Sequence, residues 1–376
     1  MKIVVKKEDL YNGIKIVEKA AGQKTVLPIL ANILIETINQ NSIRLVAQDM
    51  EMAISTIVDA QVEEEGKITL PSKTLNDIVS KLSNKLITIE FNESEGADST
   101  VVNITCQNSK FDLVGISAAE FPSMNKVAAE QQETGLDIEI KPFLKGVKQA
   151  GFAVSSADLY RIFSGVVCKI SGQTLEIAST DGNRLARVRE SIQNQENSDL
   201  QLVIPSKVLN EFIRISSYIE DESVKLTVAG KQIILNTSKI SMVAQLLEGK
   251  YPDYNVLIPQ DCQKNATVNV AEMETALDRV STLVNEKTSI VKLEFTENNL
   301  KLTADTPNMG KSEETMAIDY TGEDITIAFN YKYILDVLRH IESEEVKIGL
   351  NTNLSASVFR PNTDEDFVCL VMPVRY

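Results

Sequence analysis

The sequence has little of the chemistry on which most enzymes depend. It contains one histidine, His340, and no tryptophan among its 376 residues. A Ser-His-Asp or Cys-His mechanism, or a multi-histidine metal site, would have to use His340 alone. That residue lies in a stretch with helical spacing beside Arg339, and we interpret it as a surface residue. The sequence therefore gives little support to a catalytic role, and it offers no catalytic residue.

Cysteine and long apolar runs are also scarce. Cys106, Cys168, Cys262 and Cys369 lie far apart, and no two of them form a CxxC pair. This spacing is poor for a metal site and is typical of reduced thiols buried in a cytosolic core. No stretch approaches the ~18 apolar residues of a membrane helix, and the start MKIVVKKEDL lacks the apolar run of a signal peptide. We therefore expect a cytoplasmic protein without metal or cofactor.

Positive charge is in deficit, with a formal net charge of −15. Such a balance argues at first sight against nucleic acid, whose phosphates attract Lys and Arg. Net charge, however, does not say where the charges lie. Acidic residues gather in four groups near expected turns, which favours a solvated outer face and leaves room for a locally basic surface. These groups are 63–65, 220–222, 342–345 and 364–366.

Three similar segments recur along the chain. KITLPSKTLNDIVSKL at 67–82 and QLVIPSKVLNEFIRIS at 201–216 both place an apolar strand before Pro-Ser-Lys and a helical pattern. ITIAFNYKYILDVLRHI at 325–341 keeps this shape with Phe-Asn in place of Pro-Ser. Pro71 and Pro205 lie 134 residues apart, which is the size of a whole domain rather than of a solenoid repeat.

Each segment predicts the same order of elements: a strand, a helix, several strands, a second helix and further strands. The helical spacing of Leu10, Ile14 and Val17 and the alternation of Val291, Leu293 and Phe295 illustrate the two patterns. We therefore predict an α+β protein of three similar domains, each with two helices packed on antiparallel sheets. Polar stretches after Pro122 and Pro252 place the boundaries at 1–126, 127–254 and 255–376.

Basic side chains fall on or just after the expected helices. Taken alone, lysine on a helix face is ordinarily a solvated residue, and contact with phosphate is the less common alternative. The residues that we single out as candidates for contact with phosphate are Lys15, Lys19, Lys24, Lys81, Lys148, Lys207 and Arg214.

Asp181-Gly182-Asn183 permits two interpretations. Asp-Gly after a strand is a good signal for a tight turn. The enzymatic alternative makes Asp181 a metal ligand, but no second acidic residue lies nearby at ligand spacing. We favour the turn.

Six motifs together resemble the beta sliding clamps of bacterial DNA polymerase III. They are LPILANILIE at 27–36, EFPSM at 120–124, STDGNRLA at 179–186, EGKYPDY at 248–254, FNYKYILDVL at 329–338 and VMPVR at 371–375. The resemblance implies a DNA clamp fold in which two subunits of three domains join head to tail into a ring. The helices would face duplex DNA and contact its backbone without sequence specificity, so that the ring slides. Lys24 matches a basic residue that touches DNA.

The resemblance also implies a pocket for short linear peptides of the replicative polymerase, the clamp loader and repair factors. Leucine- or phenylalanine-like anchors would fill it, with Arg184 or Arg375 at its rim. The matching positions are Phe163, Thr180, Gly182, Arg184, Leu185, Pro252, Leu257, Leu354, Leu370, Met372, Pro373, Val374 and Arg375. Ring closure would pair Lys110 and Phe111 of one subunit with Thr282, Leu283, Glu313 and Glu314 of the other.

Three positions depart from the family pattern. Asn183 replaces a histidine of several members, Val256 replaces a basic residue, and Tyr376 replaces a terminal leucine. These changes are expected to alter peptide preference. Two other functions remain as alternatives: a clamp-like recruitment hub without ring closure, and an acidic metal-dependent nuclease or phosphatase. The latter needs clustered carboxylates, whereas Asp49 and Asp181 lie at matching places in separate repeats.

Overall fold

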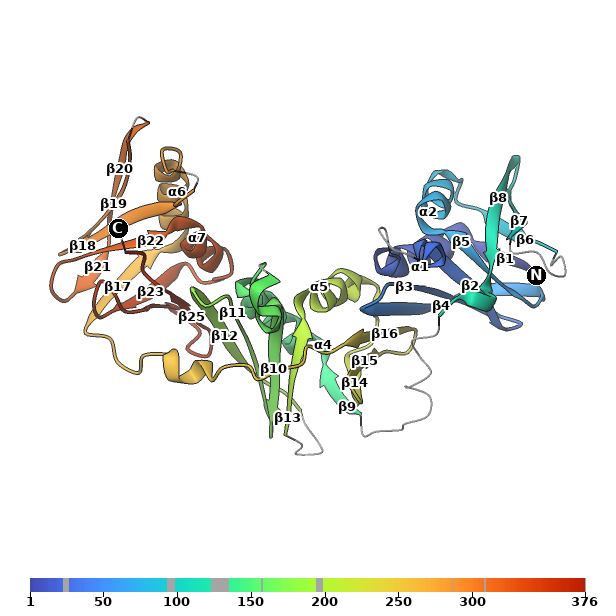
Figure 1. Ribbon diagram of the computed structural model, residues 1–376, viewed down its shortest axis with the longest axis horizontal. Coiled ribbons are helices and arrows are strands. Elements are labelled where there is room, and N and C mark those ends of the chain that lie inside the picture. The colour runs from blue at the N-terminus through green and yellow to red at the C-terminus, as the bar shows by residue number, and fades with distance from the viewer. Residues whose placement is uncertain are drawn as a thin grey trace. The chain divides into compact units, whose positions relative to one another are not determined.

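The computed structural model describes residues 1–22, 27–92, 99–122, 135–156, 158–193, 199–285, 287–307 and 309–375. The chain divides into two compact units (Figure 1). Unit 1 comprises Met1–Ile140 and Lys207–Leu246, and unit 2 comprises Lys141–Ser206 and Leu247–Tyr376.

Unit 1 is built on one 12-stranded sheet, in which β1 pairs with both β6 and β4, so that β1 to β8 close on themselves. Helices α1 and α2 pack on each other, and α1 also covers β3 and β4. Its elements are β1 (Lys2–Lys6), α1 (Lys7–Val17), β2 (Asn32–Asn39), β3 (Ser42–Gln48), β4 (Met52–Glu64), β5 (Lys67–Pro71), α2 (Ser72–Lys81), β6 (Leu86–Glu90), β7 (Ser99–Cys106), β8 (Ser109–Ser117), β9 (Leu136–Glu139), α5 (Ser206–Ile215), β14 (Ser223–Ala229), β15 (Gln232–Asn236) and β16 (Ile240–Gln245).

Unit 2 holds a 9-stranded and a 4-stranded sheet. Helices α6 and α7 pack on each other and on the smaller sheet, while α4 lies close to β11. A Cβ atom at Gly146 of α4 would come within 2.7 Å of Cδ1 of Ile177. The elements are α4 (Ile140–Ala150), β10 (Gly165–Ser171), β11 (Thr174–Thr180), β12 (Arg184–Ser191), β13 (Leu200–Pro205), β17 (Lys264–Asn269), α6 (Val270–Ser281), β18 (Ile290–Thr296), β19 (Asn299–Thr306), β20 (Gly310–Ala317), β21 (Asp319–Thr321), β22 (Ile325–Asn330), α7 (Tyr331–Arg339), β23 (Glu345–Leu350), β24 (Ser357–Pro361) and β25 (Val368–Val371).

The order of elements repeats three times, as the sequence predicts: one strand, one helix, four or five strands, one helix and three strands. The central repeat contributes to both units. Its strand β16 pairs with β4 in unit 1, and its strand β12 pairs with β25 in unit 2. Because each half of the central repeat is hydrogen-bonded into the sheet of a neighbouring repeat, the three repeats form two compact units.

Helix starts follow from local residue chemistry. In the first two repeats the proline ends a strand and the helix begins at the next residue, Ser72 or Ser206, so the missing N–H of proline removes no helical hydrogen bond. In the third repeat Asn330 takes this place, and its side chain accepts a hydrogen bond from the N–H of Lys332. The Phe-Asn variant is thus a helix cap.

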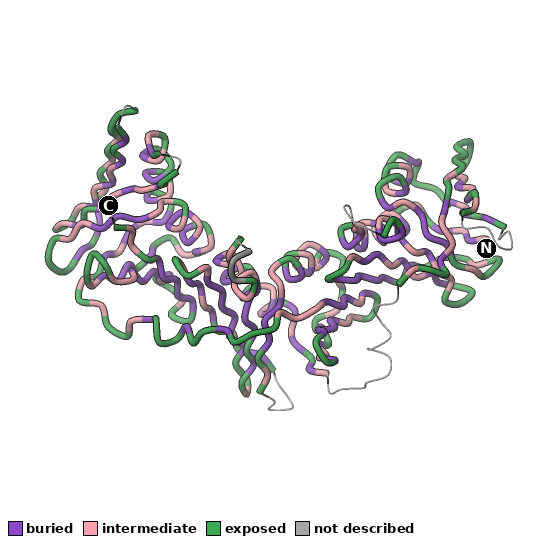
Figure 2. Tube along the Cα trace, viewed as in Figure 1, coloured by how far each residue is buried: buried purple, intermediate pink, exposed green. Residues whose placement is uncertain are grey.

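Buried residues, most of them aliphatic or aromatic, alternate with more exposed residues along many of the strands (Figure 2). Cys106, Cys168 and Cys369 are buried, as predicted, while Cys262 is only half-buried. Burial raises the pKa of the Cys168 thiol to about 12, which keeps it protonated. Across the described residues, no helix has both the length and the apolar character needed to span a membrane.

Candidate functional site

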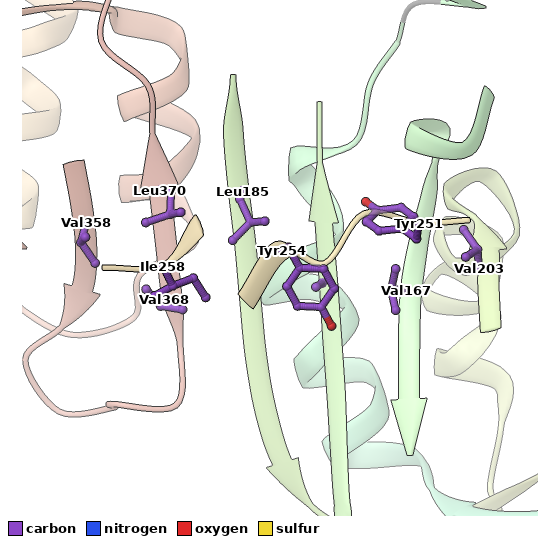
Figure 3. Packing of buried hydrophobic residues seen from close by; sticks show 10 residues of the cluster. Val167, Leu185, Val203, Tyr251, Tyr254, Ile258, Val358, Val368 and Leu370 are labelled. Carbon is purple, nitrogen blue, oxygen red and sulfur yellow. The ribbon is translucent and has the colours of Figure 1, made fainter. Parts of the chain in front are cut away.

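The predicted pocket residues in unit 2 surround one apolar cluster. Leu185 of β12 and Leu370 of β25 are opposite each other in the strand register, and both are buried. The segment 251–258 lies across this face of the sheet (Figure 3). This segment contributes Tyr251, Tyr254 and Ile258 to the cluster. Phe163 of η5 (Asp158–Ser164) packs against the cluster. The cluster also contains Val167, Ala178, Val203, Val358 and Val368.

Two tyrosines hold the segment on the sheet. The hydroxyl of Tyr251 accepts a hydrogen bond from the N–H of Thr180 over 3.1 Å, and its ring meets Phe163 edge-on with centroids 5.7 Å apart. The hydroxyl of Tyr254 donates to Oε1 of Glu176 over 2.6 Å. Burial raises the pKa of Tyr251 to about 12 and, together with the Glu176 contact, raises that of Tyr254. Both rings therefore stay neutral and suit an apolar floor.

Glu176 is a buried carboxylate beneath this segment. Burial alone would raise its pKa, but hydrogen bonds from Tyr254 and Arg189 outweigh burial and lower it. Nε of Arg189 lies 2.7 Å from Oε2 of Glu176. Glu176 is thus ionised at neutral pH and ties β11, β12 and the tyrosine segment together. The sequence reasoning missed Tyr251 and Tyr254, although both lie within the EGKYPDY motif, where two tyrosines flank Pro-Asp.

Asp181-Gly182-Asn183 forms the predicted turn. Oδ1 of Asp181 accepts hydrogen bonds from the N–H groups of Asn183 and Arg184, at 2.9 and 3.0 Å. Gly182 has a φ of +88°, a backbone conformation that favours glycine. The hydroxyl of Thr180 closes the turn by accepting from the N–H of Gly182. Within the described part of the chain, no group of three or more His, Cys, Asp or Glu residues is placed to hold a metal ion.

Arg184, expected at the rim of the pocket, has several partners within the chain. Its side chain is only 11% exposed, with Nε 3.1 Å from Oδ2 of Asp181. Nη1 contacts Asp336, and Nη2 donates to the carbonyl of Phe152 in η4 (Gly151–Ala153). The guanidinium also lies 4.8 Å from the centroid of the Tyr333 ring. Its charge is therefore already paired, and Arg184 organises the turn, whereas Arg375 is exposed.

His340 is not simply a surface residue. Its ring stacks on Phe152 with centroids 4.2 Å apart and an interplanar angle of 17°. Nδ1 lies 2.7 Å from the backbone carbonyl of Asp336. The histidine therefore contacts Phe152, whose carbonyl accepts a hydrogen bond from Arg184.

Arg184→Lys is expected to lower the free energy of unfolding by about 2 kcal/mol, because lysine cannot reproduce three hydrogen bonds and an aromatic contact at once. Arg339→Lys on α7 is the matched control. The Arg339 side chain is 51% exposed and paired with Glu274, so the expected change is below ~0.5 kcal/mol. Urea denaturation measures both variants. Equal stability of Arg184→Lys and the parent chain would show that the buried network contributes little.

The outer part of the predicted pocket is exposed and apolar. Leu257, Leu354 and Met372 are 55%, 57% and 40% exposed, and Pro252 is also exposed. The N–H of Met372 donates to the carbonyl of Asn183, and the N–H of Val374 donates to the carbonyl of Ala328. These bonds fix the C-terminal segment, which also contains the half-buried Pro373. Exposed apolar side chains thus continue from a buried apolar floor, as a site for anchor residues requires.

Comparison with known proteins identifies the family. Residues 1–125, 137–253 and 255–375 match the N-terminal, central and C-terminal domains of the DNA polymerase III beta subunit. The chain belongs to the DNA polymerase III beta-subunit family. Its function is that of this family, a DNA sliding clamp for processive replication.

Relatives match the chain from end to end. The beta sliding clamp of Synechocystis sp. is 33% identical, and the match covers 100% of this chain and 99% of that protein. A putative DNA polymerase III beta subunit from Eubacterium rectale has a crystal structure with a TM-score of 0.90 and 29% identity over 100% of both chains. The sliding clamp of Pseudomonas aeruginosa bound to griselimycin has a TM-score of 0.91 and 26% identity, again over 100% of both chains.

The candidate DNA-facing residues of this beta-subunit family member differ in exposure and in whether they form ion pairs within the chain. Lys19, Lys81 and Lys148 are exposed, and no ion pair of theirs occurs in the described part of the chain. Nζ of Lys15 lies 3.0 Å from Glu18, and Lys207 is paired with Asp49. Lys24 lies outside the described residues.

Arg214 has a structural role in this family member. Its Nη1 and Nη2 donate to the backbone carbonyls of Lys15 and Ile16, at 2.6 and 2.8 Å, and its Nε contacts Glu211. The guanidinium thereby connects α5 to the end of α1. The expectation that Arg214 faces DNA stays a prediction, but its donors already serve the packing of unit 1.

Four of the residues expected at the subunit interface lie on two strands, β8 and β20, and the other two follow helix α6. Phe111 is 37% exposed on β8, and Lys110 beside it is exposed. In unit 2, Glu313 and Glu314 lie on β20, which is the edge of the smaller sheet. Thr282 is exposed and Leu283 half-buried at the end of α6.

Both acids of β20 already have partners within the chain. Glu313 lies 3.1 Å from Lys301 and from Lys311, and Nε of Arg279 lies 2.8 Å from Glu314. Hydrogen bonds from these partners lower the pKa of both carboxyls.

Proposed function

We propose that two copies of this chain close head to tail into a ring around duplex DNA and that the ring acts as a tether, without catalytic residues of its own. The observation that carries this proposal is that β8 in unit 1 and β20 in unit 2 each have an unpaired strand edge at the residues expected to form the subunit interface. Closing them against each other would remove both edges, which otherwise invite uncontrolled association.

The edge in unit 1 belongs to β8. This strand pairs with β7 along its length but reaches β5 only through Ile116 and Ser117, so 109–115 has no second partner among the described strands. Phe111 and Val114 make this edge apolar. In unit 2, β20 pairs with β19 alone in the part of the chain that the structure describes. An antiparallel or parallel pairing of β8 with the β20 of a second copy would bury Phe111 and bring it toward Leu283.

We further propose that the apolar cluster around Leu185 and Leu370 receives the anchor side chains of short peptides from the replicative polymerase, the clamp loader and repair factors. A buried floor gives anchor residues a dry contact, and Met372 at the rim adapts to different partners because its side chain is flexible and polarizable. The sliding clamp of Pseudomonas aeruginosa binds a ligand, griselimycin. Asn183 and Val256, both exposed, would set peptide preference at the edge of this site.

The proposed division into domains is 1–126, 127–254 and 255–376, and the proposed location is the cytoplasm. Exposed lysines on α2, on α4 and on the 3-10 turn η1 (Glu18–Ala20) that follows α1 supply the proposed contacts to DNA phosphates. A recruitment hub without ring closure remains the alternative, and it predicts no role for the β8 and β20 edges. A nuclease or phosphatase would need a carboxylate cluster, for which the described residues offer no candidate.

Replacing Lys19, Lys81 or Lys148 by alanine is expected to reduce the slope of log K against log salt by about 0.9 each, since each contact releases roughly one counterion from duplex DNA. Lys169→Ala is the matched control, because Lys169 is exposed on a strand, β10, rather than on a helix. Fluorescence anisotropy with a short duplex over a salt series measures the slope. If the slope of log K against log salt is unchanged in all three variants but changes in Lys169→Ala, the DNA contacts the sheet face and not the helices.

A further inference from the structure

A cavity of about 300 Å³ lies in unit 2 and is lined by three arginines. Arg187 and Arg189 come from β12, Arg360 comes from β24, and the segment 255–260 supplies the remaining lining. The cavity shares only Ile258 with the apolar cluster of the peptide site. Neither the family resemblance nor the proposed clamp function assigns a ligand to it.

Strand geometry explains why the arginines converge. Leu185, Arg187 and Arg189 are alternate residues of β12 and so point to the same face of the sheet, as do Val358 and Arg360 of β24. Only β25 separates these two strands. Two strand spacings place the backbones at Arg187 and Arg360 about 10 Å apart, a distance that two arginine side chains can span to hold one small ion.

The positive charge of this cavity is only partly compensated. Arg189 is paired with Glu176, which also accepts the hydrogen bond from Tyr254. Arg187 and Arg360 form no ion pair within the described part of the chain. Glu176 and Asp366 are the carboxylates whose charges act on Arg187. An excess of positive charge at one place is notable in a chain whose formal net charge is −15.

Arg187 is held in an unfavourable state. Its Nε is buried and has no hydrogen-bond partner among the described residues. Burial and the neighbouring charge of Arg189 lower the pKa of Arg187 below its usual value. A buried donor without an acceptor destabilises a fold, and so does a partly buried charge that is balanced only by carboxylates with which it forms no ion pair. An oxyanion in the cavity would supply the acceptor and the charge together.

The number of guanidinium groups and the available space define the ligand. Planar guanidinium groups bind phosphate oxygens in pairs of parallel hydrogen bonds. A single carboxylate would leave one of the two unpaired arginines uncompensated. At ~30 Å³ for each water, the cavity holds about ten waters, more than one orthophosphate displaces. The side-chain amides of Asn255 and Gln260 could bind a further polar group of a larger ligand.

We propose that this cavity binds a small ligand with a diphosphate group through Arg187, Arg189 and Arg360. Two ligands share this chemistry: free pyrophosphate and a nucleoside diphosphate. The side-chain amides of Asn255 and Gln260 would bind the nucleoside and so would favour the nucleoside diphosphate. The site adjoins the peptide pocket, with which it shares Ile258, and all of its lining residues come from one chain.

Isothermal titration calorimetry of the full-length chain with sodium pyrophosphate, with adenosine diphosphate and with sodium chloride at matched ionic strength tests the proposal. We expect saturable binding of one phosphate ligand per chain and none of chloride. Tighter binding of adenosine diphosphate would assign the nucleoside as part of the ligand, and equal or weaker binding would assign the diphosphate alone. Arg360→Gln should weaken binding about tenfold or more, because it removes charged hydrogen bonds.

Arg187→Gln gives a second, independent readout. It removes the uncompensated charge, so the unliganded variant should unfold at a higher temperature than the parent chain, while the increase that pyrophosphate causes in the parent should vanish. Arg339→Gln, an exposed arginine of α7, is the matched control and should bind as the parent does. The absence of saturable binding at millimolar ligand, equal binding in Arg360→Gln and the control, or binding of an Asp- and Glu-rich peptide alone would overturn the proposal.

Discussion

Replacing Met372 by aspartate is expected to weaken the binding of a leucine- or phenylalanine-containing partner peptide by about 100-fold or more. Met372 is 40% exposed and follows β25 directly, next to the buried Leu370. An aspartate there would lose apolar contact with the anchor residue and would itself be desolvated by the peptide. Central anchor contacts of this kind are worth ~2–4 kcal/mol, which corresponds to a loss of this size. Fluorescence anisotropy with a labelled peptide measures the affinity.

Met50→Asp is the matched control for this substitution. Met50 is a 73% exposed methionine of unit 1, in the turn between β3 and β4. The same change of side chain there should leave peptide affinity unaltered. Both variants should remain dimeric, because neither residue lies on the β8 or β20 edge. Parent-like affinity in Met372→Asp would remove the peptide site from this part of unit 2.

Phe111→Asp is expected to raise the dissociation constant of the dimer by about 1000-fold or more. The proposed ring contains the same interface twice, so one substitution places an unpaired carboxylate in both contacts. A buried, unpaired charge destabilises by several kcal/mol, and the loss of the phenylalanine adds to this effect. Sedimentation velocity at nanomolar to micromolar protein measures the dimer fraction. Leu283→Asp on the facing edge should act in the same direction.

Leu86→Asp controls for a general effect of charge on unit 1. Leu86 is a 58% exposed leucine at the end of β6, a strand whose neighbours are β1 and β7. Its replacement should leave the dimer intact. A Phe111→Asp variant that stays dimeric at nanomolar concentration, with the same stability as Leu86→Asp, would favour the recruitment hub without ring closure.

Local order was predictable from the sequence because short segments determine it. The Pro-Ser-Lys motifs predict the ends of β5 and β13 and the starts of α2 and α5. Asp-Gly predicts the turn that Gly182 makes possible. The repeat of these signals also predicts the threefold order of elements. Each of these features depends on residues within about one turn or one strand of each other.

Features that depend on distant pairings were not predictable. The pairing of β16 with β4 joins segments almost 190 residues apart, and no local pattern specifies it. The partners of Arg184 come from Asp181 nearby but also from Asp336, far along the chain. Arg214 has the spacing of a surface residue on α5, yet it binds backbone carbonyls of α1. Charge on a helix therefore could not distinguish free cations from those used in packing.

Retention on circular DNA tests the ring most directly. The chain would be loaded onto nicked circular DNA by its cognate clamp loader and washed at high salt, before and after the circle is cut. We expect retention on the intact circle and loss from the linear form, because a closed ring is linked to the circle while ordinary phosphate contacts weaken steeply with salt. Equal, salt-sensitive binding to both forms would contradict the ring and would indicate a conventional DNA-binding surface.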